Sequence, residues 1–287
     1  MNQPAVPGKD RVKQFFDHLA AETAVDIITI TPQPGAVLER TGSNFGGLFY
    51  LPRECSIPCT EAGGQMYMLA QINCAELPAN NIYPDTGIMQ FWIDGSDDVM
   101  GMDFEDILSD AGKRVIYHPE ITDHLSAEEL SAIYRPQKAD DGELYTPIFE
   151  GAPLAMVFTP GKQSIRVTDF RFDAVFTEKW NEFFPDCPLD NLWELNDIDE
   201  ELFDAANEKF WGQEQCQIGG YGSFTQEDPR FEDPLDDYTE LLLQIETVNG
   251  PGYEMMWGDL GVGGFFARPQ QLADLDFANC IFNWDCG

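Results

Sequence analysis

The sequence contains few basic residues. Its 287 residues include 16 Lys and Arg against 51 Asp and Glu, which gives a formal net charge of −35. A surface of this sign repels the phosphates of nucleic acids and anionic lipid headgroups. We therefore expect neither nucleic acid nor a membrane as a partner, and we expect attraction to cations or to a basic protein partner. A purely solubilising role for the charge is the simpler alternative.

Long apolar runs are also missing. The N-terminal segment MNQPAVPGKDRVKQFF has no continuous apolar core of the kind that a secretory signal needs, and no later stretch approaches the roughly 20 apolar residues of a membrane span. The seven cysteines stand at spacings that suit no zinc site, so we expect reduced and mostly buried thiols. These patterns predict a cytoplasmic protein without a metal site.

Histidine is scarce, and catalytic motifs are absent. Only His18, His118 and His124 are present, and none accompanies a Gly-x-Ser-x-Gly elbow or a papain-like cysteine. The glycine-rich stretch MWGDLGVGGFF continues into two phenylalanines, where a phosphate-binding loop has Lys and Ser or Thr. The acidic stretch DGSDDVMGMD resembles a calcium loop whose ligands are out of register, and a solvated loop is expected there. The sequence therefore predicts no catalytic residue and no cofactor.

Short apolar runs of β-like composition dominate what is present. The runs are MYMLAQI, GIMQFWID, KRVIYH, APLAMVFT, SIRVTDFRFDAVF, TELLLQIE, GGFFAR and ANCIFNW. The stretch VDIITITPQPG is a further strand, stopped by its prolines. Helical spacing is confined to residues 9–23, to the segment after the capping box of Ser126 and Glu129, and to a segment from about Asp197 to Gly212. We predict a strand-rich α+β fold with a few flanking helices.

The runs repeat along the chain. Gly219 follows Gly46, and Gln244 follows Gln71, each by 173 residues. Each copy then continues with a glycine-led aromatic strand and a further apolar strand, which indicates an internally duplicated unit with two similar antiparallel sheet-containing halves. We expect one compact domain with three parts: an N-terminal helix and strand in residues 1–40, a first repeat unit in residues 41–160, and a second in residues 161–287.

Ordered motifs from about Phe45 to the C-terminus carry a family resemblance. They are FGGLFYLP, LAQINCAELP, GIMQFWI, VIYHPEI, IGGYGSFTQEDPR, LLLQIE, MWGDLGVGGFF and IFNWDCG. The chain resembles the YwqG-like bacterial proteins, a family built on a domain of unknown function. The resemblance implies a mixed α and β fold with internal duplication, supplies no agreed enzymatic activity, and suggests a toxin-neutralising role. The family often has a histidine before the second turn, and the stretch CQIGGYG lacks it here.

The candidate site residues lie in or beside the repeats. Gln71 and Gln244 occupy equivalent places in apolar strands, where each either satisfies its amide internally or lines a cleft between the halves. Arg230 either locks loops by bidentate bonds to a nearby carboxylate or helps to grip a ligand. If Arg230 helps to bind a ligand, we expect a cleft with Trp257 and Trp284 at its floor, in which Asp259 and Asp285 bind a cationic or sugar-like ligand.

The sequence favours a non-catalytic, acidic interaction protein that binds a basic protein partner, with toxin neutralisation as the more specific form of this hypothesis. The alternative is an enzyme or small-molecule binder with its site at the junction of the two repeats. A single deep pocket there, with the candidate side chains converging beside a perturbed carboxylate, would favour the alternative.

Overall fold

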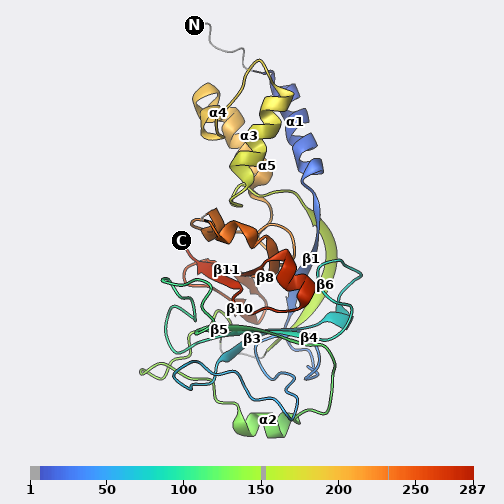
Figure 1. Cartoon of the computed structure of the whole chain (residues 1–287), viewed down its shortest axis with the longest axis vertical. Helices are drawn as coiled ribbons and strands as arrows, with labels where there is room; N and C mark the ends of the chain where they lie inside the picture. The colour runs from blue at the N-terminus through green and yellow to red at the C-terminus, as the bar shows by residue number, and fades with distance from the viewer. Residues whose placement is uncertain (1–6, 150–152, 232) are drawn as a thin grey trace.

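The structure is a computed structural model that describes residues 7–149, 153–231 and 233–287. Helices and strands are mixed, and strands predominate (Figure 1). The α-helices of the described residues are α1 (Lys9–Glu22), α2 (Ala127–Ile133), α3 (Phe172–Phe183), α4 (Trp193–Ile198), α5 (Glu200–Trp211) and α6 (Pro269–Asp274).

A large antiparallel sheet forms the body of the molecule. It has the strand order β12-β11-β8-β7-β1-β6-β2-β3-β4-β5. Its strands are β1 (Val25–Gln33), β2 (Asn44–Phe45), β3 (Tyr67–Asn73), β4 (Ile88–Ile93), β5 (Lys113–His118), β6 (Leu154–Gln163), β7 (Cys216–Ile218), β8 (Glu240–Glu246), β11 (Val262–Ala267) and β12 (Ile281–Asp285). A separate hairpin is formed by β9 (Val248–Gly250) and β10 (Tyr253–Met255).

The long strands β1 and β6 pair along their whole length at the centre of the sheet, from Val25 opposite Gln163 to Gln33 opposite Ala155. Strands β2 to β5 continue the sheet beyond β6, and β7, β8, β11 and β12 continue it beyond β1. We call these the first arm and the second arm. The α+β, strand-rich character expected from the sequence is confirmed, whereas the internal duplication and the three-part division stay predictions.

The sheet curls until its two arms face each other and is nearly closed. The rings of Phe91 in β4 and Phe265 in β11 lie 5.0 Å apart, although the two strands belong to opposite arms. At the edges, the indole of Trp284 in β12 donates to the carbonyl of Val99, at 2.7 Å. Strands β4 and β11 are buried on both faces because the other arm covers one face, while α2 and loops cover the other face of β4 and loops cover that of β11. Their apolar composition follows from this double burial.

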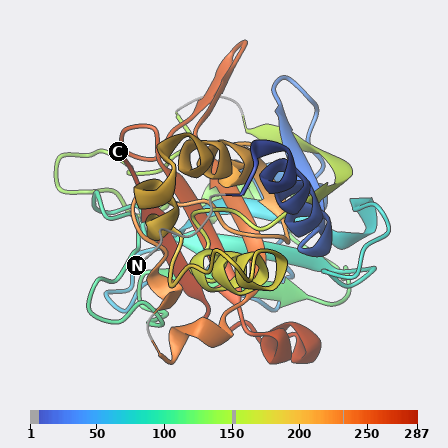
Figure 2. The same ribbon diagram turned by 90° about the horizontal axis from the view of Figure 1, so that it is seen from above.

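Helices α1, α3, α4 and α5 form a second hydrophobic core at one end of the molecule, above the sheet in Figure 1 and in front of it in Figure 2. Phe15 of α1 packs edge-on against Phe176 and Trp180 of α3, with ring centroids 5.3 and 5.4 Å apart. The chain reaches this helical cluster through β1 and β6, because α1 directly precedes β1 and α3 follows β6.

Helix α3 corrects one prediction from the sequence. The stretch of residues 164–176 was expected to be a strand, but the chain becomes helical at Phe172. The strand-like alternation of apolar residues ends near Val167. After it, Phe172, Phe176 and Trp180 follow one another at intervals of four residues and form the buried face of a helix. Helices α4 and α6 were also not predicted, since each has only six residues.

Other local predictions are confirmed. Both bonds of the capping box between Ser126 and Glu129 are present at the start of α2, and α5 ends at Gly212, whose φ is +82°. The seven cysteines form no disulfide in the structure; four are buried, as expected, whereas Cys55 and Cys59 are exposed and Cys286 is half-buried. Within the described ranges, the structure has no helix that is both long and apolar enough to cross a membrane.

Candidate functional site

Gln71 lies in β3 of the first arm and is fully buried. Its Oε1 accepts hydrogen bonds from the Tyr50 backbone N–H and from Gln90 Nε2, both at 2.8 Å. Its Nε2 donates to the carbonyls of Arg40 and Gly42, also at 2.8 Å. Every hydrogen-bonding position that a glutamine offers is thus used within the protein, and the side chain fastens two loops to the strand.

Gln244 occupies the matching place in β8 of the second arm. Its Oε1 accepts from the Ser223 backbone N–H at 2.7 Å, and its Nε2 donates to the Gln215 carbonyl at 3.1 Å. The second amide hydrogen goes to Glu246 Oε1 at 3.0 Å. Gln71 and Gln244 bond to different segments, so the structure does not bring the two amides together in one hydrogen-bond network.

Trp257 and Asp259 flank the glycine-rich turn before β11. The Trp257 side chain is fully buried and donates its indole N–H to the Ile245 carbonyl at 2.9 Å. Its ring packs against Gly263, where an added Cβ would lie 2.4 Å from the ring. The Asp259 residue is exposed, and its backbone carbonyl accepts from Gly287. The glycines therefore make room for an aromatic ring and for close chain approach.

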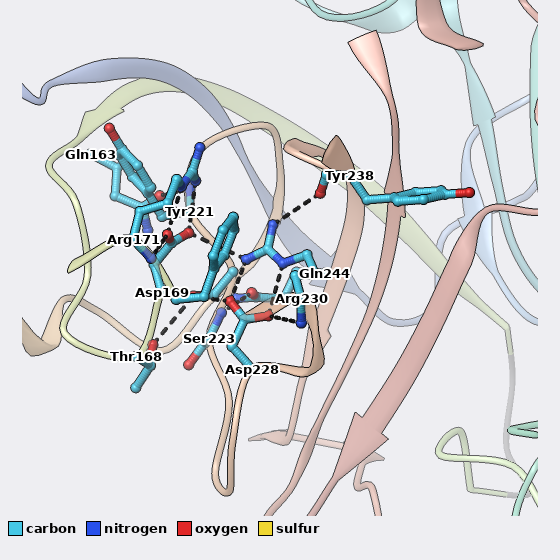
Figure 3. Close-up of polar contacts among 12 residues, drawn as sticks. Gln163, Thr168, Asp169, Arg171, Tyr221, Ser223, Asp228, Arg230, Tyr238 and Gln244 are labelled. Atoms are coloured by element: carbon cyan, nitrogen blue, oxygen red, sulfur yellow. Dashed lines mark hydrogen bonds and ion pairs between the residues drawn. The ribbon is translucent and has the colours of Figure 1, made fainter. Parts of the chain in front are cut away.

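Arg230 lies at the centre of a buried charged network (Figure 3). Its Nε and one terminal nitrogen donate to the two oxygens of Asp228, at 2.9 and 2.6 Å. The same guanidinium donates to Asp169 at 3.3 Å and to the Tyr238 carbonyl at 3.2 Å. It also lies 4.2 Å from the ring centre of Phe266. The bidentate pair expected for Arg230 is present, with Asp228 as the carboxylate.

Arg171 completes the network from the other side. It holds Asp169 with two bonds of 2.7 and 2.8 Å. Burial by itself raises the pKa of the Asp169 carboxyl, but the bonds from Arg171 and the charge of Arg230 outweigh burial, so the pKa lies below its ordinary value. Two arginines thus balance two aspartates. This neutral, saturated arrangement joins the segment after β6 to the loop before β8 and leaves no ionised group free for chemistry.

Asp285, at the end of β12, fastens the neighbouring loop. One of its oxygens accepts from the backbone N–H and the hydroxyl of Thr225, at 3.0 and 2.9 Å, and the other accepts from the Gln226 N–H at 3.1 Å. Gln226 and Glu227 are thereby held as an exposed ridge beside the charged network.

A hollow of about 510 Å³ opens beside this ridge, and we call it the α5 hollow. Asn207 and Trp211 of the helical cluster form one wall, and the loop with Glu227 and Phe231 forms another. Glu227 lines it with an exposed carboxylate, Asp169 and Asp228 line it with carboxylates already paired with Arg171 and Arg230, and none of its described lining residues is Lys or Arg. Trp211 and Phe231 are 51% and 59% exposed, unusually high values for large aromatic side chains. The hollow is therefore acidic with an aromatic rim.

A family model matches residues 43–286, and its description is a domain of unknown function, DUF1963. The chain belongs to the DUF1963 family. No curated protein matches the chain. The matched range begins just before β2, so it includes the α5 hollow and the charged network but not α1 or β1.

Glu246 is a feature of this DUF1963 domain that the sequence analysis missed. It is 5% exposed at the end of β8. Burial raises the pKa of its carboxyl to about 7, and the charge of the nearby Arg166 only partly opposes this. Within the residues that the structure describes, no three His, Cys, Asp or Glu side chains are placed to hold a metal ion.

Asp169, Arg171, Trp211 and Phe231 were also missed. The first two lay in the run interpreted as a strand, and the two aromatics stand at the ends of short segments with no motif. The one available signal was the pair of Arg-containing stretches TDFR and EDPR, each with an acid two residues before its arginine. The roles of Gln71, Gln244, Arg230, Trp257, Asp259 and Asp285 in ligand binding stay predictions.

Proposed function

We propose that this DUF1963 protein is a non-catalytic binding protein whose ligand is a basic protein partner, and that the α5 hollow takes part in the contact. The observation that carries the proposal is the composition of the hollow, which combines the exposed carboxylate of Glu227 with exposed aromatic rings and no basic lining side chain among the described residues. A Lys or Arg side chain suits such a site because carboxylates pair with its charge and aromatic faces attract cations.

The charge of the whole chain supports the same partner. Eight basic side chains form ion pairs with the protein's own carboxylates, namely Lys9, Arg53, Lys113, Lys162, Arg171, Lys179, Lys209 and Arg230. The surplus of carboxylates stays unbalanced. Long-range attraction then speeds the approach of a positively charged protein.

The finer features of the proposal rest on the sequence. Neutralisation of a basic toxin is the specific form that the YwqG-like resemblance supports, and the free cysteines support action in the reducing cytoplasm. The duplication is supported by equivalent hydrogen bonds in the two arms. The backbone groups that bond the Gln244 side chain belong to Ser223 and Gln215. The residues 173 positions earlier, Tyr50 and Gly42, make the same backbone bonds to Gln71.

The test is the association of the protein with cytochrome c, a basic protein, measured by stopped flow over a range of NaCl concentrations. We expect the association rate to fall steeply as salt rises, because screening weakens the steering field. Replacing both Trp211 and Phe231 with alanine should weaken the affinity about tenfold, mainly through faster dissociation. Trp193→Ala, an exposed aromatic on α4, is the matched control. A rate insensitive to salt would contradict the proposal.

One observation favours the alternative, a small-molecule site near the junction. Glu246 is a buried carboxyl with a strongly raised pKa. It accepts a hydrogen bond from Gln244 and lies near Arg166, whose Nε has no hydrogen-bond partner among the described residues. Such a group is a candidate for acid–base chemistry. Fluorescence of the buried tryptophans during titration with a panel of amino acids and sugars would test this, and a response lost in Glu246→Gln would support it.

A further inference from the structure

Two more hollows continue from the α5 hollow across the surface. The next one, of about 500 Å³, shares Gln226 and Glu227 with it and is also lined by Trp284 and Asp285 of β12. We call it the β12 hollow. A third, of about 560 Å³, shares the segment 102–104 with the β12 hollow and lies over the loop after β4. The three together are the acidic groove, in which each hollow meets the next along a shared ridge.

The charge of the acidic groove has one sign along its whole length. Each hollow is lined by at least one carboxylate that is not part of the charged network, Glu227 in the α5 hollow, and none of the described lining residues of the three is Lys or Arg. Asp97, Asp103 and Glu105 line the third hollow, and Glu227 lies on the ridge between the other two. Burial, with the charge of nearby Asp94, raises the pKa of the Asp97 carboxyl. Crowded carboxylates of this kind are stabilised in their ionised form by an arriving cation.

Exposed aromatic rings accompany the carboxylates. Phe104, which is 76% exposed, stands on the ridge between the β12 hollow and the third hollow. Phe231 and Trp211 border the α5 hollow. Large rings exposed at two places along one groove are not explained by packing, because each keeps half or more of its surface in solvent. They offer apolar contact and cation–π attraction to whatever lies in the groove.

We propose that the acidic groove binds an extended segment of the partner protein that carries several arginine or lysine side chains. This inference rests on the proposed function, since it names the part of the basic partner that is recognised. Successive hollows separated by ridges suit a chain in extended conformation, whose side chains enter one hollow after another.

The experiment uses fluorescence anisotropy of a fluorescein-labelled peptide of about twelve residues in which arginine and serine alternate, an extended chain of roughly 40 Å. The intact protein should bind it at least about tenfold more tightly than a labelled Arg-Ser-Arg fragment, because several hollows act in series. Spermine, a flexible polycation without a peptide backbone, is the competitor. Weak competition by spermine supports the proposal, and displacement as efficient as that by unlabelled peptide overturns it.

Variants at two separated places in the groove test its continuity. Phe104→Ala and Asp103→Asn, where the β12 hollow meets the third hollow, and Trp211→Ala, in the α5 hollow, should each weaken peptide binding about three- to tenfold. Asn at position 103 keeps an acceptor for the backbone N–H groups of Glu105 and Asp106, so the loop is retained. Trp193→Ala and Asp186→Asn, exposed changes in the helical cluster outside the groove, are the matched controls.

The outcomes separate the two proposals. If cytochrome c associates in the salt-dependent manner but the peptide gains nothing over the short fragment, the groove proposal is overturned and the proposed function stands. The groove proposal also fails if Phe104→Ala and Asp103→Asn leave peptide affinity unchanged while Trp211→Ala lowers it. If neither basic probe binds in a salt-dependent way, both proposals fail.

Discussion

Loss of Arg230 leaves a buried charge unpaired, because Asp228 has its ion pair with Arg230, whereas Asp169 is also held by Arg171. Arg230→Met keeps much of the side-chain volume but removes the bonds to Asp228 and one bond to Asp169. We expect the free energy of unfolding, measured by urea denaturation, to fall by about 3–5 kcal/mol. The control is Arg53→Met, whose exposed pair with Glu129 should matter little. Unchanged stability together with lost peptide binding would show that Arg230 grips a ligand instead.

Glu246 gives the stability a dependence on pH. Its carboxyl has a pKa of about 7 in the fold against an ordinary value of 4.5. Since the folded-state pKa is raised, the folded protein binds the extra proton, and stability present below pH 4.5 is lost as the pH rises towards and through 7. Glu246→Gln removes this loss, so at pH 8 the variant should be more stable than the parent by up to about 3 kcal/mol.

The measurement for Glu246 is urea unfolding of both proteins from pH 4.5 to pH 8. Only the difference between the two curves matters, because the other carboxylates titrate in both. A constant difference across this range would contradict the assignment. The sequence showed an acid at the end of an apolar strand, but it contained no signal that Glu246 is buried, because burial depends on what covers the strand.

At the level of elements, the turn between Trp257 and β11 is fixed by close chain approach. An added Cβ at Gly261 would lie 2.0 Å from the backbone oxygen of Asp285, so Gly261→Ala must push β11 and β12 apart. We expect a loss of about 1–3 kcal/mol in the free energy of unfolding. Gly161→Ala in β6, where the nearest atom lies at 3.4 Å, is the control, with an expected change within about 0.5 kcal/mol. Equal effects of the two changes would contradict this account.

Elements with a strong local signal were predictable from the sequence, and elements decided by distant contacts were not. The capping box of α2 and the glycine after α5 mark their helices through bonds made within a few residues. Helix α3 was missed because residues 164–171 alternate like a strand, and its helical stripe is explained only by the packing of Phe176 and Trp180 on α1. The hollows combine segments far apart in the chain, such as 207–211 with 226–231, which no local pattern brings together.

At the level of the whole molecule, the charge of −35 acts against compactness, because like charges repel more strongly in the folded protein. We therefore expect added NaCl to raise the melting temperature by several degrees between low and physiological ionic strength. Differential scanning calorimetry measures this directly. A melting temperature that falls over the same range would mean that the internal ion pairs, which salt weakens, outweigh the repulsion.

The walls of the α5 hollow belong to two separately packed cores, since Trp211 comes from the helical cluster and Glu227 and Phe231 from loops of the sheet. Anything held between these walls bridges two bodies that the chain itself connects through β1, β6 and β7. A bound peptide would then oppose detachment of the helices and slow hydrogen exchange in α1, which lies outside the groove. Hydrogen exchange in α1 would thus show whether the groove is occupied, although α1 does not contact the bound peptide.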